Sequence, residues 1–483
     1  MNAVIQHEDS GKERFQRKLA DSRYFAFSLV LHLVLVILLG AIVLHRATMD
    51  PPDFVADGDG LIATPDSLPA AAESPADAVP AESFAPETPK INSPSIDIIS
   101  TTATTNTFKV APAAVAINLK TDVAELAKAT GNIAKGIGSG IGGLPGTMGG
   151  RSGSGRAAAM KQNKMKPASE LAVLRGLEWL RLNQNADGSW GDVHKSAMTG
   201  LAFLCFLGHG ETAESEQYGV TVSKAVEWLL TNGTTHQGRL TSDGNITQPG
   251  SYEQGIATYA LGEYFTMTKD ERVVELLKQA LTHIVQGQGP DGGWMYSFDK
   301  SPGDLSVSGW QIQALKAGHL TGLKIAGVDA ALDKAMLYLD KVKGPNGGYG
   351  YRGPEDKYSL SGVGILCSLF WKGERGKLTK GMGWIIESTD KQFPVKYKAP
   401  SADLYAWYYH TQAALMFGGG AWDKWNRWFQ DEITAAQNPD GSWPVSGNAS
   451  HAPAGKSGDV YRTTLCILML EVFYRYMPTN AAL

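Results

Sequence analysis

Two kinds of apolar segment alternate along residues 168–483, and both have helical spacing. The first kind carries apolar residues at intervals of three and four, as in ELAVLRGLEWLRLNQ and ERVVELLKQALTHIVQ. That spacing predicts amphipathic helices with one buried face. The second kind, such as TGLAFLCFLG and SGVGILCSLF, is apolar on nearly every side and predicts helices that are buried all round. The two kinds alternate six times, so the pattern predicts six helix pairs.

The second helices recur at an almost constant step. Steps of 55, 54, 53, 49 and 52 residues separate Gly200, Gly255, Gly309, Gly362, Thr411 and Thr463. Such a period is typical of stacked helix hairpins. An open array needs polar capping repeats, and none is clear here, so we expect the array to close. The expected fold class is all-α, an (α/α)6 toroid of six hairpins with apolar helices inside and amphipathic helices outside.

Short turns between the helices share a motif. QNADGSW, QGPDGGW and QNPDGSW all read Gln-x-x-x-Gly-x-Trp, and their Asp-Gly steps indicate tight turns. KGPNGGY, over residues 343–349, has the same shape, and two further copies are more degenerate. The motif residues are Gln184, Trp190, Gln288, Trp294, Gln437 and Trp443.

These turns and paired helices resemble the α/α toroid of squalene-hopene cyclases and protein prenyltransferase β subunits, a squalene cyclase-like superfamily, over residues 168–483. The resemblance implies that the motif Gln and Trp residues tie neighbouring helices together at the outer rim and have no catalytic role. It also raises terpenoid chemistry, but the cyclase acid motif Asp-x-Asp-Asp is absent from the chain. A third toroid family carries a thioester Cys-Gly-Glu-Gln, and Ser251 stands where its Cys would be.

The cysteines predict neither a disulfide scaffold nor a metal site. Cys205, Cys367 and Cys466 lie in apolar runs without a CxxC pair. None has Asp two residues before it, as the zinc-binding Asp-x-Cys pair of prenyltransferases would require. We therefore expect no metal and no cofactor.

Aromatic and ionisable residues that precede or begin the second helices should converge at one rim of the ring, where they could line a ligand cavity. Alternatively, Asp304 and Asp459 could cap helices and the aromatic side chains could fill the ring as core. Among them, His410 is the candidate to titrate near neutral pH. Glu253 is expected to favour a helix N-terminus through its charge. The candidates are Tyr252, Glu253, Asp304, Trp310, Tyr358, Trp407, Tyr409, His410, Asp459, Tyr461 and Arg462.

Residues 24–45 are expected to form a transmembrane helix. Twenty of them, residues 25–44, include only Ser28 and His32 as strongly polar side chains, which is the length that a hydrocarbon core of about 30 Å requires. Five Lys and Arg residues precede the span within residues 12–23, whereas only Arg46 follows it closely. This asymmetry predicts a cytoplasmic tail over residues 1–23 and a toroid in the periplasm, anchored by a single uncleaved span in a bacterial inner membrane.

The span also resembles the Ser-x-x-x-His anchor of TonB-type energy transducers. That resemblance implies a proton-channel-type membrane complex as partner, contacted through Ser28 and His32, because an intramembrane His usually faces a partner helix or a proton path. A plain anchor with His32 on a tolerated face is the alternative. Residues 46–167, rich in Pro, Ala and Gly, predict a disordered linker, with a short marginal helix from Thr121.

Charge and motif content leave two functional hypotheses. The formal net charge of −4 and the lack of a long basic run argue against nucleic acid as a partner. The first hypothesis is a membrane-tethered, non-catalytic toroid that binds an envelope protein or an apolar, isoprenoid-like ligand. The second is an isoprenoid-modifying enzyme that uses Asp459, His410 or Glu253 as acid or base. We favour the first, because both family motifs are missing and a linker with a coil span of about 60 Å suits a distant partner.

Overall fold

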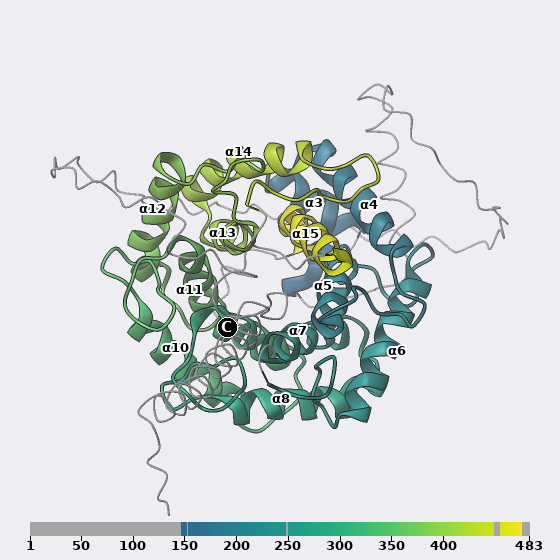
Figure 1. Cartoon of the computed structure of the whole chain (residues 1–483). Coiled ribbons are helices and arrows are strands. Elements are labelled where there is room, and N and C mark those ends of the chain that lie inside the picture. The colour runs from purple at the N-terminus through teal and green to yellow at the C-terminus, as the bar shows by residue number, and fades with distance from the viewer. Residues whose placement is uncertain (1–145, 152, 248–249, 449–454, 476–483) are drawn as a thin grey trace, which may run out of the picture. The chain divides into compact units, whose positions relative to one another are not determined.

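The computed structural model describes residues 146–151, 153–247, 250–448 and 455–475, and the regular elements within these residues are helices. Six helices form an outer ring and six an inner ring (Figure 1). The outer helices are α4 (Pro167–Leu182), α6 (Gly219–Thr235), α8 (Val274–Gly287), α10 (Val328–Val342), α12 (Arg375–Lys391) and α14 (Gly419–Ala435). The inner helices are α5 (Lys195–Gly208), α7 (Gly250–Thr268), α9 (Leu305–Leu320), α11 (Tyr358–Phe370), α13 (Leu404–Phe417) and α15 (Gly455–Leu470).

Contacts between the first and last repeats close the ring. Each inner helix packs against the inner helices before and after it, and α15 packs against α5 in the same way. The outer helix α14 likewise packs against α4. The sequence prediction of an all-α toroid built from six helix pairs is confirmed for the described residues.

Burial follows the two hydrophobic patterns. In α7 every residue from Gly250 to Met267 is buried, whereas α8 buries a single stripe that includes Leu277, Leu281 and Ile284. Glycines of the repeat allow close packing between inner helices: a Cβ on Gly362 would lie 2.4 Å from Cδ2 of His410. The glycine that recurs in the repeat therefore marks a helix crossing.

The inner helices run parallel, so the ring has two distinct ends. Between α7 and α9, Gly255 packs on Gln311 and Gly262 packs on Ala317, so both chains advance in the same direction. We call the end where the inner helices begin the N-terminal mouth, and the end where they finish the C-terminal mouth. Because helix dipoles add, the C-terminal mouth concentrates partial negative charge and free carbonyl groups.

The helical region starts earlier than the sequence predicted. Within the range assigned to the linker, Gly146–Arg151 forms the 3-10 helix η2 and Gly153–Gln162 forms α3. Their low apolar content explains the difference, because both segments are attached mainly by polar contacts described below. A 3-10 turn, η3 (Glu271–Val273), precedes α8, and α16 (Val472–Arg475) follows α15.

The predicted membrane span over residues 24–45, with Ser28 and His32, lies outside the described residues, as does most of the predicted linker. Among the residues that the structure does describe, none of the helices combines the length and the apolar character needed to cross a bilayer.

Candidate functional site

Aromatic side chains from the second turn of α9 and of α13 meet inside the ring. The Trp310 ring stacks on Tyr408 with centroids 5.7 Å apart and meets Tyr409 edge-on at the same distance. Trp310 lies on α9 and the tyrosines lie on α13, with α11 between these helices, so the contacts cross the ring interior. Gln313 Nε2 also donates to Tyr409 Oη at 3.1 Å. None of the three rings has solvent-accessible surface. Side chains therefore occupy the space that a central ligand would need at this level.

The other aromatic candidates are also packed. Tyr252 Oη lies 2.8 Å from Ser306 Oγ, and Tyr358 Oη lies 2.8 Å from Thr389 Oγ1. Trp407 and Tyr461 have no exposed surface. These residues lie on the inner helices, as the sequence predicted. Their side chains are packed as core, however, and do not line a cavity.

The two candidate aspartates differ sharply. Asp304 is the N-cap of α9: its carboxylate accepts from the Ser306 backbone N–H at 3.0 Å, and burial raises its pKa. Arg352 Nε lies 3.3 Å from the same carboxylate. Asp459 is exposed and pairs with Arg462. It cannot be an N-cap as the sequence suggested, because α15 begins at Gly455.

Glu253 and His410 are also fixed by local contacts. Glu253 lies in the first turn of α7, where it accepts hydrogen bonds from the Ser242 backbone N–H at 3.1 Å and from the Ser242 hydroxyl. His194 Nδ1 lies 3.5 Å away from its other oxygen. His410 is fully buried, and its Nε2 donates to the Tyr358 carbonyl at 2.9 Å. Burial lowers the pKa of His410 to about 3, so the expected titration near neutral pH is wrong.

The motif Gln residues make the same two hydrogen bonds in all three copies. Each side-chain amide donates to a carbonyl of its own turn and to one on the next outer helix. For Gln288 the acceptors are Gly292 at 2.9 Å and Ala331 at 2.8 Å. Gln437 reaches Ala172 at 2.8 Å and so links the last repeat to the first. Gln184 donates to Gly188 at 2.9 Å and Thr221 at 3.0 Å.

The motif Trp residues hold each turn against the outer helix before it. Their Nε1 atoms donate to the carbonyls of Leu180, Ile284 and Ile433 at 2.7 to 2.8 Å. The three indoles are buried. The donors, in chain order, are Trp190, Trp294 and Trp443.

Two substitutes for the motif Gln were missed by the sequence analysis. Gln254, at the start of α7, donates to the Gly238 carbonyl at 3.0 Å and the Ala280 carbonyl at 3.2 Å, which links the degenerate second turn to α8. Lys343 donates to the Lys377 carbonyl at 3.0 Å on α12. In the KGPNGGY copy, Lys343 stands in the Gln position of the motif, which was the available signal.

An arginine from the predicted linker fills the C-terminal mouth. Arg151 is 2% exposed, and its Nη1 lies 2.9 Å from Glu263 Oε2. The same nitrogen donates to the Leu207 carbonyl at 3.2 Å, and Nε donates to the Arg475 carbonyl at 3.2 Å. Glu263 is also paired with Arg475 Nη2 at 3.4 Å. Arg151 thus contacts one carboxylate, a carbonyl near the C-terminal end of the inner helix α5 and the carbonyl of the last residue of α16.

A second arginine of the same tract extends the network. Arg156 donates to the backbone carbonyls of Arg151 and His209, and its Nη1 lies 3.7 Å from Glu170 Oε1. His209 Nδ1 in turn lies 2.7 Å from Glu211 Oε1. We call residues 146–151 and 153–163 the mouth tract; its last residue, Asn163, donates to the Phe473 carbonyl at 2.6 Å.

The charges at this mouth nearly balance. Burial alone would raise the pKa of Glu263, but the charges of Arg151 and Arg475 outweigh burial and hold the pKa below its usual value. In the same way, His209 and Arg156 outweigh burial at Glu170. Glu471 differs, since neither of its oxygens has a hydrogen-bond partner and burial raises its pKa well above the usual value.

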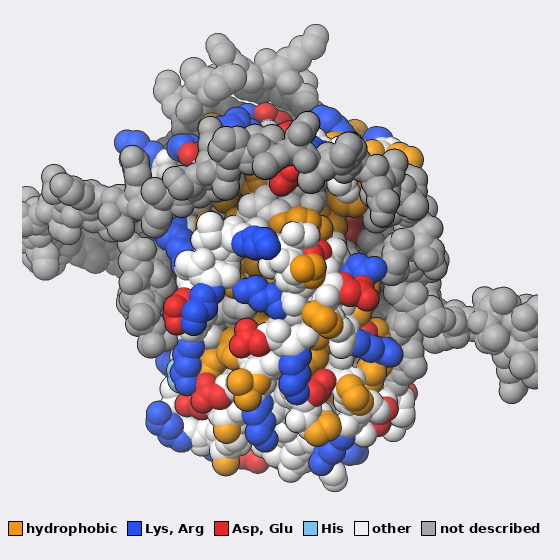
Figure 2. Space-filling view, turned by 90° about the vertical axis from the view of Figure 1, so that its left-hand side faces the viewer, with side chains coloured by type: hydrophobic (Ala, Val, Ile, Leu, Met, Phe, Trp, Pro, Cys, Tyr) orange, Lys and Arg blue, Asp and Glu red, His pale blue; other side chains and the backbone are white. Residues whose placement is uncertain are grey.

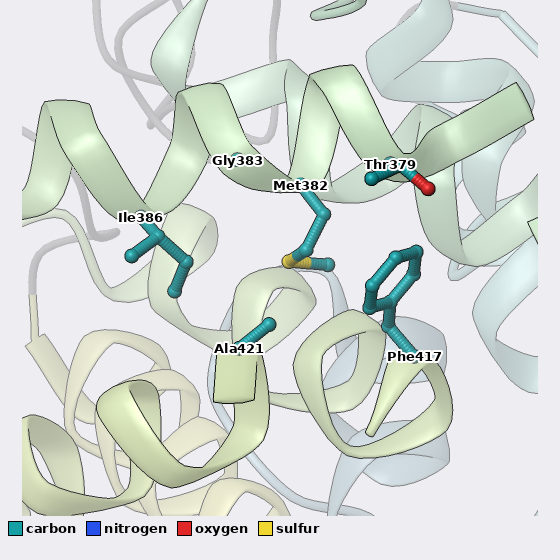
Figure 3. A pocket seen from close by; sticks show the side chains of 6 residues that line it. All are labelled: Thr379, Met382, Gly383, Ile386, Phe417 and Ala421. Carbon is teal, nitrogen blue, oxygen red and sulfur yellow. The ribbon is translucent and has the colours of Figure 1, made fainter. Parts of the chain in front are cut away.

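An apolar pocket lies in the outer wall, away from the ring axis (Figure 3). Met382 and Ile386 of α12 point toward Phe417 and Ala421, at the junction of α13 and α14. Its lining is completed by Thr379 and Gly383. The pocket holds no ionisable side chain, so it offers no acid or base for chemistry.

Within the described ranges, no three His, Cys, Asp or Glu side chains are grouped closely enough to hold a metal ion. Cys205, Cys367 and Cys466 are buried free thiols. Burial raises the pKa of the Cys367 and Cys466 thiols, so they are poor nucleophiles.

Comparison with known proteins yields distant fold neighbours. No family model and no curated protein matches the chain. An α-1,6-mannanase from Salegentibacter is 12% identical over 63% of this chain and 98% of its own, with a TM-score of 0.48. A type II terpene cyclase from Scytonema is 13% identical over 63% of this chain and 98% of its own, with a TM-score of 0.44. These likenesses identify no shared chemistry.

Proposed function

We propose that this protein is a membrane-tethered envelope protein whose toroid binds a protein partner and carries out no cyclase chemistry. The observation that carries the proposal is the filled ring interior, where Trp310, Tyr408 and Tyr409 pack without accessible surface. Cyclisation of an isoprenoid would need an enclosed space beside an acid. The outer surface of the ring, where Figure 2 shows charged side chains interspersed with hydrophobic ones on one side, is then the part available for binding.

The placement of the ionisable candidates also argues against the enzyme hypothesis. Asp304 caps a helix and His410 stays neutral in the core, while Asp459 lies on the surface beside Arg462. General acid or base catalysis needs such a group within hydrogen-bond reach of a bound substrate. None of these three groups faces a described cavity.

The attachment of the mouth tract to the ring by polar contacts supports the tethering part of the proposal. Arg151 and Asn163 bind groups far along the chain, in α7 and in α16. These contacts fix the place on the ring to which a linker from the predicted membrane anchor is attached. The anchor itself, with Ser28 and His32 facing a membrane partner, remains part of the proposal.

The tether can be tested with topology reporters in a bacterial host. Alkaline phosphatase fused after residue 483 should be active, because it folds only in an oxidising periplasm, and a fluorescent protein fused there through the same export route should stay dark. The protein should pellet with membranes. A soluble protein with an inactive phosphatase fusion would refute the tether.

Partner binding needs a separate experiment. Photo-crosslinkers placed on exposed outer-helix positions, such as Lys334 and Lys380, should yield a discrete adduct with an envelope protein in membranes. The same protein incubated with squalene or geranylgeranyl substrates should give no cyclised product. Turnover of such a substrate would favour the enzyme hypothesis, and the absence of any adduct would refute the binding hypothesis.

A further inference from the structure

The contacts of the mouth tract indicate a binding site that the tract itself occupies. Arg151 uses two nitrogens on different partners: Nη1 contacts the Glu263 carboxylate, the Leu207 carbonyl and Met267 Sδ at 3.4 Å, while Nε donates to the Arg475 carbonyl. A guanidinium holds these two donors in a fixed plane, whereas a lysine ammonium acts as a single point charge. The separate Nε contact therefore favours arginine over lysine.

Without the tract, the mouth would hold more carboxyl groups than groups that can balance them. Removing Arg151 and Arg156 leaves four carboxyl groups, of which Glu471 favours its protonated form because burial raises its pKa, and the groups that face the others are Arg475 and the His209 imidazole. Carbonyls at the C-terminal ends of the inner helices add further negative potential. The carboxyl groups left at this mouth are those of Glu170, Glu211, Glu263 and Glu471.

The tract is held by polar contacts and little apolar surface. Of its side chains, only Met148 and Ala159 belong to the buried apolar core. The sequence from 146 to 156, GTMGGRSGSGR, contains five glycines, which lose the most chain entropy on ordering. Segments with few buried apolar contacts open at a lower free energy than the core. We therefore expect the tract to open at a lower free energy than the twelve ring helices, and the contacts that it must break are those of the buried Arg151, Arg156 and Asn163 side chains.

We propose that the C-terminal mouth is a binding site for an arginine-bearing peptide segment, filled in cis by Arg151 of the mouth tract. A partner with a suitably placed arginine would bind by displacing the tract. This inference deepens the proposed function, since it rests on protein binding by the ring and names the chemistry of one partner segment.

A labelled peptide tests the site directly. The probe is a fluorescein-labelled peptide of residues 146–163, and its anisotropy is measured with the full-length protein, either wild type or Arg151→Ala. We expect at least tenfold tighter binding to Arg151→Ala, because the cis tract competes in the wild type at a high effective concentration. A peptide carrying Arg151→Lys should bind at least tenfold more weakly. Lys161→Ala, which changes an exposed residue of the same tract, is the matched control and should behave as wild type.

Two outcomes would overturn the proposal. Equal binding of the Arg and Lys peptides would mean non-specific attraction to an acidic surface, and no binding to a folded Arg151→Ala protein would mean that the tract is a permanent structural cap. Hydrogen exchange on the wild type covers the case in which the variant does not fold. Excess peptide should speed exchange in α3 and leave α9 and α13 unchanged, whereas unchanged exchange in α3 would refute displacement.

Failure here can be separated from failure of the proposed function. A ring that crosslinks to an envelope protein but does not bind the peptide would overturn the arginine site alone. A ring that binds the peptide but gives no envelope adduct would leave the site intact and refute the proposed partner. Peptide binding requires no membrane, so it is also independent of the tether.

Discussion

The Gln288 side chain provides the sharpest test of how the repeats are joined. Its amide donates to the carbonyls of Gly292 and Ala331, and both of those residues are buried. Gln288→Ala removes two hydrogen bonds, each worth about 1 kcal/mol net, so the free energy of unfolding should fall by about 2 kcal/mol. Gln288→Glu keeps the shape but replaces the donor with a negatively charged acceptor that faces two carbonyl oxygens. The Glu variant should therefore be less stable than the Ala variant.

Both effects are large enough to measure. For a ring of roughly 320 residues the unfolding entropy is about 0.7 kcal/mol per kelvin, so a loss of 2 kcal/mol lowers Tm by about 3 °C. Urea titration followed by circular dichroism at 222 nm should show a lower midpoint with an unchanged m value. The control is Gln392→Ala, an exposed position at the end of α12, which should stay within about 0.5 kcal/mol of wild type.

The relative stability of the two Gln288 variants decides whether the side-chain amide acts as a hydrogen-bond donor. If Gln288→Glu proved as stable as Gln288→Ala or more so, the amide would not act as a donor and our account of the repeat junction would be refuted. Gln437 makes equivalent bonds to Gly441 and Ala172, but at the closure between the last and first repeats. In a closed ring Gln437→Ala should cost as much as Gln288→Ala, because neither junction lies at an end.

Three further predictions concern Glu471, His410 and two glycines of the ring. In thermal melts, Glu471→Gln should leave Tm unchanged near pH 4 and raise it increasingly toward pH 8. Burial raises the pKa of Glu471 in the folded protein, so the unfolded chain loses that proton first as the pH rises and the wild type is destabilised. A smaller Tm difference at pH 8 than at pH 4 would contradict this. The imidazole of His410 should show no inflection between pH 5 and 8 by NMR, given its pKa of about 3, and a midpoint near 6.5 would mean that the ring interior is wet. Gly383→Ala should stabilise α12 by about 0.5 to 1 kcal/mol, since no atom lies within 4 Å of the added Cβ. Gly362→Ala should instead destabilise the folded protein, since its Cβ would press on His410. Urea midpoints that move in the same direction for both variants would contradict this account of the two sites.

The ring could be predicted from sequence because its determinants are local and repeated. Apolar spacing separated helices buried on one face from helices buried all round, and the constant step placed glycines such as Gly255 at equivalent crossings. The Gln-x-x-x-Gly-x-Trp turns marked three of the junctions. The role of Gln254 at a degenerate junction was not predicted, because that side chain comes from the following inner helix, outside the turn.

The character of the candidate rim could not be predicted in the same way. An Asp before a helix can cap it or face a ligand, and the sequence alone does not separate these roles. The structure assigns Asp304 to the cap and leaves Asp459 on the surface. For His410, the decisive fact is complete burial against Tyr358 and Trp425, which depends on three separate helices.

The mouth tract was assigned to the linker because its composition indicates that it can bury little apolar surface. The structure holds this segment to the ring by charged and polar contacts instead. Arg151 meets Glu263 and Arg475, 112 and 324 residues away in sequence, and no local pattern encodes such contacts. The inner helices all end at this mouth, so carbonyls and partial negative charges accumulate there, and arginines are the natural complement. A fragment cut at residue 168, where the apolar repeat begins, would lose both Arg151 and Arg156 while keeping the carboxyl groups that they balance. Such a fragment would expose these carboxyl groups, whereas the full chain presents the mouth with its own arginine in place.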